Sequence, residues 1–276
     1  MKRKSYRVSF PGGNGYDLAG IVDRPTHTGD DREPSLAENA PVAIFSHCFT
    51  CNKDLKAIVR ISRALSDLGV NVLRYDMTGL GGSGGNFAET NFSSNQADLV
   101  AAIRFANAEL GPVTALIGHS FGGAVSLAHA AQNNNDPNIK ALVTLAAPSD
   151  TQHLANLLSQ RDPDIEKLGV GKVTIGGITW DITKQMIDDF RTHDLTGLIP
   201  TIKVPTLLFH SPTDTTVNFD HALRIMGLLQ NAPENPHVPS LVALNGADHL
   251  LVNEPADLTF VAETTAAFLS RHARMS

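Results

Sequence analysis

Short apolar segments alternate with amphipathic ones along most of the chain. The apolar segments are bounded by turn-forming residues, and such brief uninterrupted runs are typical of strands buried on both faces of a parallel sheet. Their alternation with helices predicts an α/β protein with a mostly parallel central sheet flanked by helices. The expected strands are residues 42–46, 71–75, 113–118, 141–145, 206–210 and 240–244.

Three of the segments near these strands carry apolar residues at helical spacing. The first helix is expected to end at Gly69, because glycine readily adopts the left-handed conformation that follows a helix. The second is expected to begin with Ser93 and Gln96, which have the spacing of a capping box. The three apolar faces consist of Ile58, Ile61, Leu65 and Leu68, of Leu99, Ile103, Ala106 and Leu110, and of Leu258, Val261, Thr265 and Phe268.

Two parts of the chain depart from this alternation. Residues 6–25 alternate apolar and polar side chains around a glycine-rich turn, which predicts an antiparallel hairpin, and residues 26–40 are expected to form a loop. The alternation also lapses over about residues 148–200, where two helices and a hairpin on a Gly-Gly turn are expected. So long an excursion from a core strand predicts a cap or lid inserted into a single domain, residues 1–276.

The sequence Gly118-His119-Ser120-Phe121-Gly122 lies between a predicted strand and a predicted helix. In that context G-x-S-x-G is a nucleophile elbow, which holds the serine on a strained turn that larger neighbours would obstruct. The N-terminus of the following helix favours negative charge that develops near the serine. A glycine-rich turn with an incidental serine is the alternative, and the strand–turn–helix context argues against it. Ser120 is therefore the expected nucleophile.

A serine nucleophile needs a base and an acid that orients the base. His249 follows the last predicted strand and Asp214 follows the one before it. Both therefore lie at carboxyl ends of strands, where ligands gather in open α/β sheets. The order Ser120, Asp214, His249 is also the order in which such triads occur along chains with this elbow. We expect these three residues to be catalytic.

Other residues compete for the roles of acid and base. Asp248 adjoins His249 and is poorly placed to orient it, and Asp150 follows an earlier strand. Asp214 could instead cap a helix that begins near Asn218. Three further histidines are expected to be structural or to support the site, because each lies before or within its turn. These are His47, His119 and His210.

An oxyanion hole needs two backbone N–H donors. The residue after the nucleophile, Phe121, is expected to supply one of them. The other is expected from the loop that follows the strand at 42–46, in which Phe49 is the candidate.

Cys48 and Cys51 flank Phe49 in that loop. A C-x-x-C sequence ahead of a helix resembles a redox dithiol, since a helix N-terminus lowers the pKa of a thiol. Two small side chains that fill a crowded loop are the simpler interpretation, and cysteines so close together do not staple a fold. A redox role stays open as a hypothesis, in which oxidation distorts the oxyanion loop and switches activity off.

Composition and charge narrow the classes of partner. A formal net charge of −6 at pH 7 and a pI near 6.0 argue against nucleic acid and anionic membranes, which select basic surfaces. No secretory apolar segment follows the basic residues 2–4, and no apolar run approaches the roughly 20 residues of a membrane span. A cytoplasmic protein is therefore expected, and the sequence leaves open whether it forms a homodimer.

Neither a cofactor nor a metal is expected. Gly79, Gly81 and Gly84 match the dinucleotide-binding pattern G-x-G-x-x-G after a strand, but the next helix begins too far along the chain to hold a pyrophosphate. These glycines are instead expected to form a tight loop that borders the active site. The histidines do not cluster with carboxylates or thiols at the spacing of zinc ligands.

Residues 45–54, 73–83, 91–94 and 210–214 carry a resemblance to a known family, and the stretch H-C-F-T-C within 45–54 is its most distinctive part. These segments resemble bacterial α/β hydrolases that are often fused to an OsmC-type peroxide-reductase domain, and the related feruloyl and cinnamoyl esterases. The esterases carry H-G-F-T-G in the same place with the oxyanion donor at the Phe, which implies the same role for Phe49. No OsmC-like segment fits within this chain, so the resemblance implies no peroxidase activity.

The expected function is the hydrolysis of small-molecule carboxylic esters through an acyl-enzyme intermediate on an α/β-hydrolase fold. A thioesterase, an amidase or a cofactor-free perhydrolase with the same triad remains an alternative, and a non-catalytic binding protein is a further one. The insertion is expected to supply an apolar acyl or aryl pocket. The expected pocket residues are Cys48, Leu157, Ile175, Ile178, Trp180 and Phe190.

Overall fold

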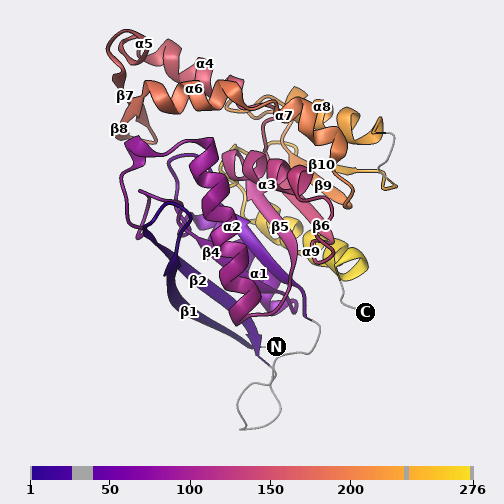
Figure 1. Cartoon of the computed structure of the whole chain (residues 1–276). Helices are drawn as coiled ribbons and strands as arrows, with labels where there is room; N and C mark the ends of the chain where they lie inside the picture. Colours follow the sequence, from indigo (N-terminus) through magenta and orange to yellow (C-terminus); the bar gives the residue numbers. More distant parts are fainter. Residues whose placement is uncertain (1, 27–39, 233–235, 274–276) are drawn as a thin grey trace.

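The computed structural model describes residues 2–26, 40–232 and 236–273. Within these ranges eight strands form one sheet in the order β1-β2-β4-β3-β5-β6-β9-β10, and β7 and β8 form a separate hairpin (Figure 1). The six strands from β4 to β10 in that order run parallel, and β1 and β2 extend one edge as an antiparallel pair. The strands are β1 (Lys2–Pro11), β2 (Asp17–Thr26), β3 (Val42–Ser46), β4 (Asn71–Tyr75), β5 (Val113–His119), β6 (Ala141–Leu145), β7 (Val170–Ile175), β8 (Ile178–Thr183), β9 (Thr206–His210) and β10 (Ser240–Ala243).

Helices cover both faces of the main sheet, which explains why the central strands are apolar at nearly every position. Alternate side chains of each strand enter different cores. Ile44 packs in the core shared with α2 and α3, whereas Phe45 packs in the core shared with α1 and α9. The helices are α1 (Lys56–Asp67), α2 (Phe92–Glu109), α3 (Phe121–Gln132), α4 (Gln152–Arg161), α5 (Asp164–Leu168), α6 (Lys184–Thr192), α7 (Leu195–Leu198), α8 (Asp220–Gln230) and α9 (Pro255–His272), with short 3₁₀ turns at η1 (Phe87–Glu89) and η2 (Ile199–Thr201).

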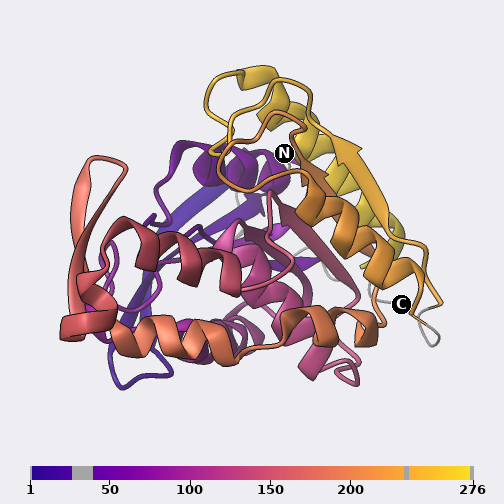
Figure 2. The same ribbon diagram turned by 90° about the horizontal axis from the view of Figure 1, so that it is seen from above.

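The chain leaves the sheet after β6 and returns at β9, and the excursion over 146–205 contains α4 to α7 and the β7–β8 hairpin. Figure 1 shows α4, α5 and α6 as a layer above α2 and α3, and Figure 2 shows α4 and α6 running side by side. The Gly-Gly turn of the hairpin is present, with φ of 60° at Gly176 and 81° at Gly177. The helix expected from Ile182 begins only at Lys184, because Ile182 still pairs with Gly171 in β8.

The predicted strands of the main sheet are all present, with β5 ending one residue later and β10 one residue earlier than expected. The start of α2 differs from the prediction. Asn91 is its N-cap and forms the capping box with Ser94, so Ser93 and Gln96 do not. Asparagine caps helices as well as serine does, and the pattern alone could not choose between two overlapping candidates. Most of the expected loop at 26–40 lies outside the described residues.

The glycine-rich loop after β4 closes on an aspartate and does not border the cavity over Ser120. The Gly82 N–H donates to Asp76 Oδ2 at 2.7 Å, and a Cβ on Gly81 would lie 2.2 Å from the same oxygen. Lys53 donates to this carboxylate through Nζ at 2.8 Å and through its backbone N–H at 2.6 Å. The expectation that these glycines border the active site is therefore wrong, and their role is to bring backbone close to Asp76.

A buried ion pair ties β4 to the N-terminal hairpin. Arg74 is 1% exposed, and its Nε donates to Asp23 Oδ2 at 2.9 Å. Its Nη1 also donates to the Lys53 carbonyl at 2.7 Å and to Asp54 Oδ1 at 3.0 Å. Asp23 is fully buried and also accepts a hydrogen bond from the Ser5 hydroxyl. Removal of the arginine would leave this carboxylate buried without its compensating charge.

We predict that Arg74→Met lowers the free energy of unfolding by about 3–5 kcal/mol, the cost of breaking a buried pair on one side. The matched control is Lys172→Met, which removes an exposed pair between Lys172 and Asp181 and should cost less than about 1 kcal/mol. Urea unfolding followed by circular dichroism measures both. Equal losses in the two variants would contradict the structural role assigned to Arg74.

Candidate active site

Ser120 lies on a tight turn between β5 and α3. Its φ of 53° and ψ of −118° are strained for a residue with a side chain. The turn requires glycine on both sides, because backbone atoms occupy the space that a side chain at either position would need. A Cβ on Gly118 would lie 2.3 Å from the Gly122 carbonyl oxygen, and one on Gly122 would lie 2.4 Å from that of Ser46. The expected elbow geometry is present, and it packs the start of α3 against the end of β3.

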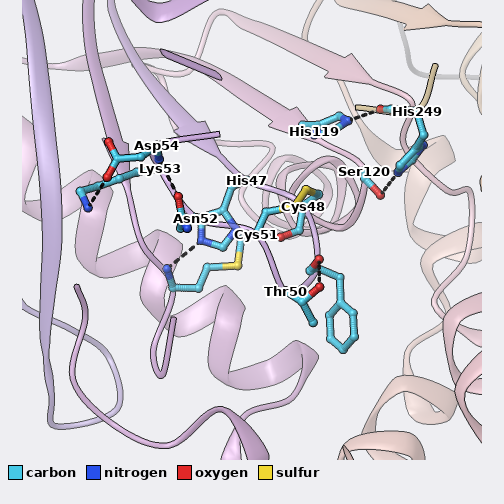
Figure 3. Close-up of a disulfide and its surroundings, with 12 residues drawn as sticks. His47, Cys48, Thr50, Cys51, Asn52, Lys53, Asp54, His119, Ser120 and His249 are labelled. Atoms are coloured by element: carbon cyan, nitrogen blue, oxygen red, sulfur yellow. Dashed lines mark hydrogen bonds and ion pairs between the residues drawn. A yellow bond between two sulfur atoms is a disulfide. The ribbon is translucent and has the colours of Figure 1, made fainter. Parts of the chain in front are cut away.

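The three predicted catalytic side chains form one hydrogen-bonded line. His249 Nδ1 lies 2.7 Å from Asp214 Oδ2. On the other side of the ring, His249 Nε2 lies 2.9 Å from Ser120 Oγ (Figure 3). A carboxylate can only accept, so Nδ1 carries the proton and Nε2 is free to accept from the serine hydroxyl. The geometry is the one that a serine nucleophile, a base and an orienting acid require.

The carboxylate of Asp214 is held in its charged form. Burial alone would raise its pKa, but the hydrogen bond and charge of His249 and the N–H groups of Val217 and Thr216 together keep the pKa below its ordinary value. Asp214 does not cap a helix, because α8 has Phe219 as its N-cap. The competing acids have other partners: Asp248 Oδ1 accepts backbone N–H bonds within its own loop, and Asp150 Oδ1 accepts from the N–H of residue 153.

The three other histidines have the supporting roles expected of them. His47 Nδ1 donates to the Cys48 carbonyl at 2.8 Å, and its Nε2 accepts from the Met77 N–H at 3.0 Å. His210 Nε2 donates to the Val217 carbonyl at 2.8 Å, which holds the loop after Asp214. Burial lowers the pKa of both histidines.

His119 contacts His249 directly. Its Nε2 donates to the backbone carbonyl of His249 at 2.7 Å, and the two rings lie 5.3 Å apart (Figure 3). Its Nδ1 is buried and has no hydrogen-bond partner among the described residues. Burial, reinforced by the nearby His249, lowers the pKa of His119 to about 3. The ring is therefore neutral at any working pH and places no charge beside His249.

The loop after β3 brings Phe49 to the edge of the site. The N–H groups of Phe49 and Phe121 make no hydrogen bond among the described residues, and both residues line the cavity with Ser120. The two rings pack edge to face with centroids 5.5 Å apart. The first N–H groups of a helix have no partner within it, so that of Phe121 is available to a ligand at the start of α3.

Cys48 and Cys51 are joined by a disulfide that brackets Phe49 and Thr50 (Figure 3). The simpler interpretation from the sequence, two small side chains that fill a crowded loop, did not include this bond. The resemblance to a helix-terminal dithiol is also not supported, because α1 begins only at Lys56. The signal for the bond was the spacing itself, since a turn brings the Cα atoms of residues three apart to 5.3 Å.

A cavity of about 310 Å³ opens over Ser120 and His249. Its walls are mostly apolar and come from α4, from the β7–β8 hairpin and from the loops that carry the three catalytic candidates. Cys48, Leu157, Ile175 and Ile178 line it as expected. Further apolar side chains in the lining are Leu154, Leu158, Val217 and Leu250.

Two predicted pocket residues lie behind the cavity wall instead. Phe190 is completely buried, with its ring centroid 6.0 Å from that of Phe49 and 5.6 Å from that of Phe121. Trp180 packs on Phe87 at 4.7 Å. Both were chosen for size and hydrophobicity, which do not distinguish the lining of a cavity from the layer beneath it. Leu154 and Leu158 follow from helical spacing around Leu157 and could have been found.

Comparisons with known proteins show the family of this chain. The esterase domain of a Rhodothermus marinus protein is 35% identical over 99% of this chain and 100% of that one, with a TM-score of 0.71. The chain belongs to the α/β-hydrolase superfamily. A family model described as serine aminopeptidase, S33, matches residues 50–157. No curated protein matches the sequence.

More distant structures share the fold of this α/β hydrolase. Est1E from Butyrivibrio proteoclasticus, with ferulic acid bound, is 22% identical over 96% of this chain and 98% of its own, with a TM-score of 0.76. The α/β-hydrolase domain-containing protein 10 from mouse is 20% identical over 96% and 99%, with a TM-score of 0.73. The likeness to hydrolases fused to an OsmC-type domain stays a prediction from the sequence.

Two negative findings concern the described residues of the hydrolase. They contain no group of three or more His, Cys, Asp or Glu side chains placed to hold a metal ion. They also contain no helix long and apolar enough to cross a membrane.

We predict that the buried His119 makes the hydrolase less stable in acid. Unfolded histidine takes up a proton below about pH 6.5, whereas folded His119 does so only near pH 3. Between these values the unfolded state binds more protons, so stability falls as pH falls. His119→Leu removes this contribution, and its loss of unfolding free energy from pH 6.5 to pH 5 should be about 1.5 kcal/mol smaller than in the wild type. Urea titrations at each pH measure it, and equal losses would contradict the prediction.

Proposed function

We propose that this hydrolase is a serine carboxylesterase that cleaves small-molecule esters through an acyl-enzyme intermediate. The observation that carries the proposal is the line Asp214–His249–Ser120, with contacts of 2.7 and 2.9 Å, at the floor of an apolar cavity. The proposal is also supported by the Rhodothermus marinus relative, which is described as an esterase domain.

In the proposed reaction, His249 Nε2 accepts the Ser120 proton as Oγ attacks the ester carbonyl. Asp214 holds the imidazole in the tautomer with the proton on Nδ1 and stabilises the imidazolium that forms. The N–H groups of Phe49 and Phe121 donate to the oxyanion of the tetrahedral intermediate, where such donors act more strongly than on the ground-state carbonyl. His249 then protonates the alcohol that leaves. A water molecule, activated by His249, releases the acid and restores Ser120.

The cavity suits an apolar acyl or aryl group. Its lining includes Leu154, Leu157 and Leu158 of α4 and Ile175 and Ile178 of the hairpin. Burying an apolar ligand against such walls is favourable because it removes apolar surface from water. In this proposal the excursion between β6 and β9, the predicted insertion at 148–200, acts as the cap over the site. Est1E, which shares the fold, was solved with ferulic acid bound.

An aminopeptidase is the second candidate, because the matched family model is named for one. Such an enzyme needs a carboxylate to bind the ammonium group of its substrate. Asp150 is the acidic residue in the described lining, but its Oδ1 accepts from the N–H of His153 and its Oδ2 lies 3.7 Å from Arg224. Because this carboxylate is already engaged, an ester fits the cavity better than a peptide N-terminus.

The proposed function predicts that a fluorophosphonate labels Ser120 at one equivalent per chain. Ser120→Ala should abolish labelling and the hydrolysis of p-nitrophenyl butyrate. Asp214→Asn should keep the fold and lower kcat about 10⁴-fold, the effect of losing the correct imidazole tautomer. Mass spectrometry of the labelled peptide and initial rates give the answer. A folded protein that neither labels nor turns over would favour the binding-protein alternative.

A second prediction concerns the cavity. Leu157→Trp narrows it without touching the triad, so kcat/KM for an octanoate ester should fall at least about tenfold. The acetate ester, whose acyl group is much shorter, should change by less than about threefold. Rates with p-nitrophenyl esters of increasing chain length test this. A uniform loss along the series would place Leu157 outside the acyl site.

A further inference from the structure

We propose that the Cys48–Cys51 disulfide is a positioning element of the oxyanion hole, so that its reduction lowers the turnover of the hydrolase. The proposal rests on the proposed esterase function. It gives the disulfide a role that is separate from the hydrogen bonds among Asp214, His249 and Ser120. It also reverses the direction of the sequence hypothesis, since the structure with the bond formed already holds Asp214, His249 and Ser120 in one hydrogen-bonded line.

The disulfide closes the turn that carries the proposed donor. It joins the residues on either side of Phe49 and Thr50, and one backbone hydrogen bond, from the Cys51 N–H to the Cys48 carbonyl at 3.2 Å, crosses the same turn. Thr50 has a φ of 61°, a left-handed conformation that a β-branched residue adopts only under constraint. The covalent bond supplies that constraint.

Both ends of the turn are anchored to the end of β4, and the tip is not. His47 connects the Cys48 carbonyl to the Met77 N–H, with contacts of 2.8 and 3.0 Å. On the other side, the Lys53 N–H donates to Asp76 Oδ1 at 2.6 Å. Between these anchors the backbone N–H of Phe49 has no partner among the described residues, and its ring packs on the rings of Phe87 and Phe121. The direction of this N–H therefore depends on the geometry of the turn.

A small reductant in the cavity can also reach the disulfide. Both cysteines line the cavity beside Ser120 and His249, and Cys48 is buried whereas Cys51 is half-buried. A small dithiol can therefore attack Cys51 Sγ first, which breaks the S–S bond and releases Cys48 as a thiolate. The second thiol of the reductant then attacks the mixed disulfide. The products are two protein thiols and the cyclic disulfide of the reductant, with two electrons and two protons transferred to the protein.

Reduction is expected to affect the transition state more than substrate binding. Once the bond is broken, Thr50 can relax to negative φ, which rotates the peptide group between Phe49 and Thr50. The backbone N–H of Phe49 is then no longer held in one direction. Loss of one oxyanion donor typically lowers kcat by about 10²–10³-fold, because the donor acts on charge that exists only in the transition state. A donor that is loosened and not removed should cost at least about tenfold in kcat, with KM within about threefold.

The test compares oxidised and dithiothreitol-reduced protein with p-nitrophenyl butyrate. The sequence contains 2 cysteines, so a thiol titration of zero or two per chain reports this bond alone. Reoxidation of the reduced protein should restore kcat. The variant with Cys48→Ala and Cys51→Ala together should have the low kcat of the reduced form and should not respond to dithiothreitol, which controls for effects of the reductant on the assay. Hydrogen exchange of residues 47–54 should increase on reduction.

Each outcome decides the proposal. A reduced protein with two free thiols and a kcat within twofold of the oxidised form overturns it. So does a loss of kcat accompanied by an equal rise in KM or by unfolding, since that pattern indicates a structural role. If fluorophosphonate labels Ser120 equally fast in both forms, the disulfide proposal fails and the esterase proposal stands. If neither form labels or turns over, the proposed function fails and the disulfide proposal fails with it.

Discussion

The close contact between the start of α3 and the end of β3 is the constraint on which the site depends. Gly122 lies so near the Ser46 and His47 carbonyls that a Cβ would come within 2.4–2.5 Å of their oxygens. This contact places the first free N–H groups of α3 beside the loop that carries Phe49. It also forces Ser120 into its strained conformation, which presents Oγ to His249. This one packing contact thus positions Ser120 and both proposed oxyanion donors.

Strain of this kind recurs around the site. Among the described residues, the non-glycine residues with positive φ are Thr50, Ser120, Ala146 and Leu251. They follow the carboxyl ends of β3, β5, β6 and β10, where the loops converge on the cavity. Residues in such conformations each cost about 1–3 kcal/mol and persist only where surrounding structure determines them. The parallel sheet and its two cores provide that determination for Ser120, Ala146 and Leu251, whereas for Thr50 the proposed constraint is the Cys48–Cys51 disulfide.

Features that depend on short-range chemistry could be predicted from the sequence. Buried strands, the elbow around Ser120 and the order of Asp214 and His249 are visible in spacing and residue type, and the structure agrees with them. Features set by competition or by three-dimensional proximity were missed. Asn91, and not Ser93, is the N-cap of α2. The glycines after β4 form a loop around Asp76. Phe190 lies behind the cavity wall, although it is as hydrophobic as the residues that line the cavity. The disulfide depends on a turn geometry that cysteine spacing permits but does not require.

Because of the excursion between β6 and β9, the cavity lining and the groups proposed for bond cleavage come largely from different parts of the chain. These strands are neighbours in the sheet, so the chain that makes α4 to α7 leaves and returns without displacing any other strand. The groups proposed for bond cleavage lie on loops after β3, β5, β9 and β10, whereas much of the apolar lining comes from the excursion. Changes in the length or composition of this one connection can therefore remodel what the cavity accepts while the reacting atoms stay in place, which makes the fold easy to adapt to new substrates.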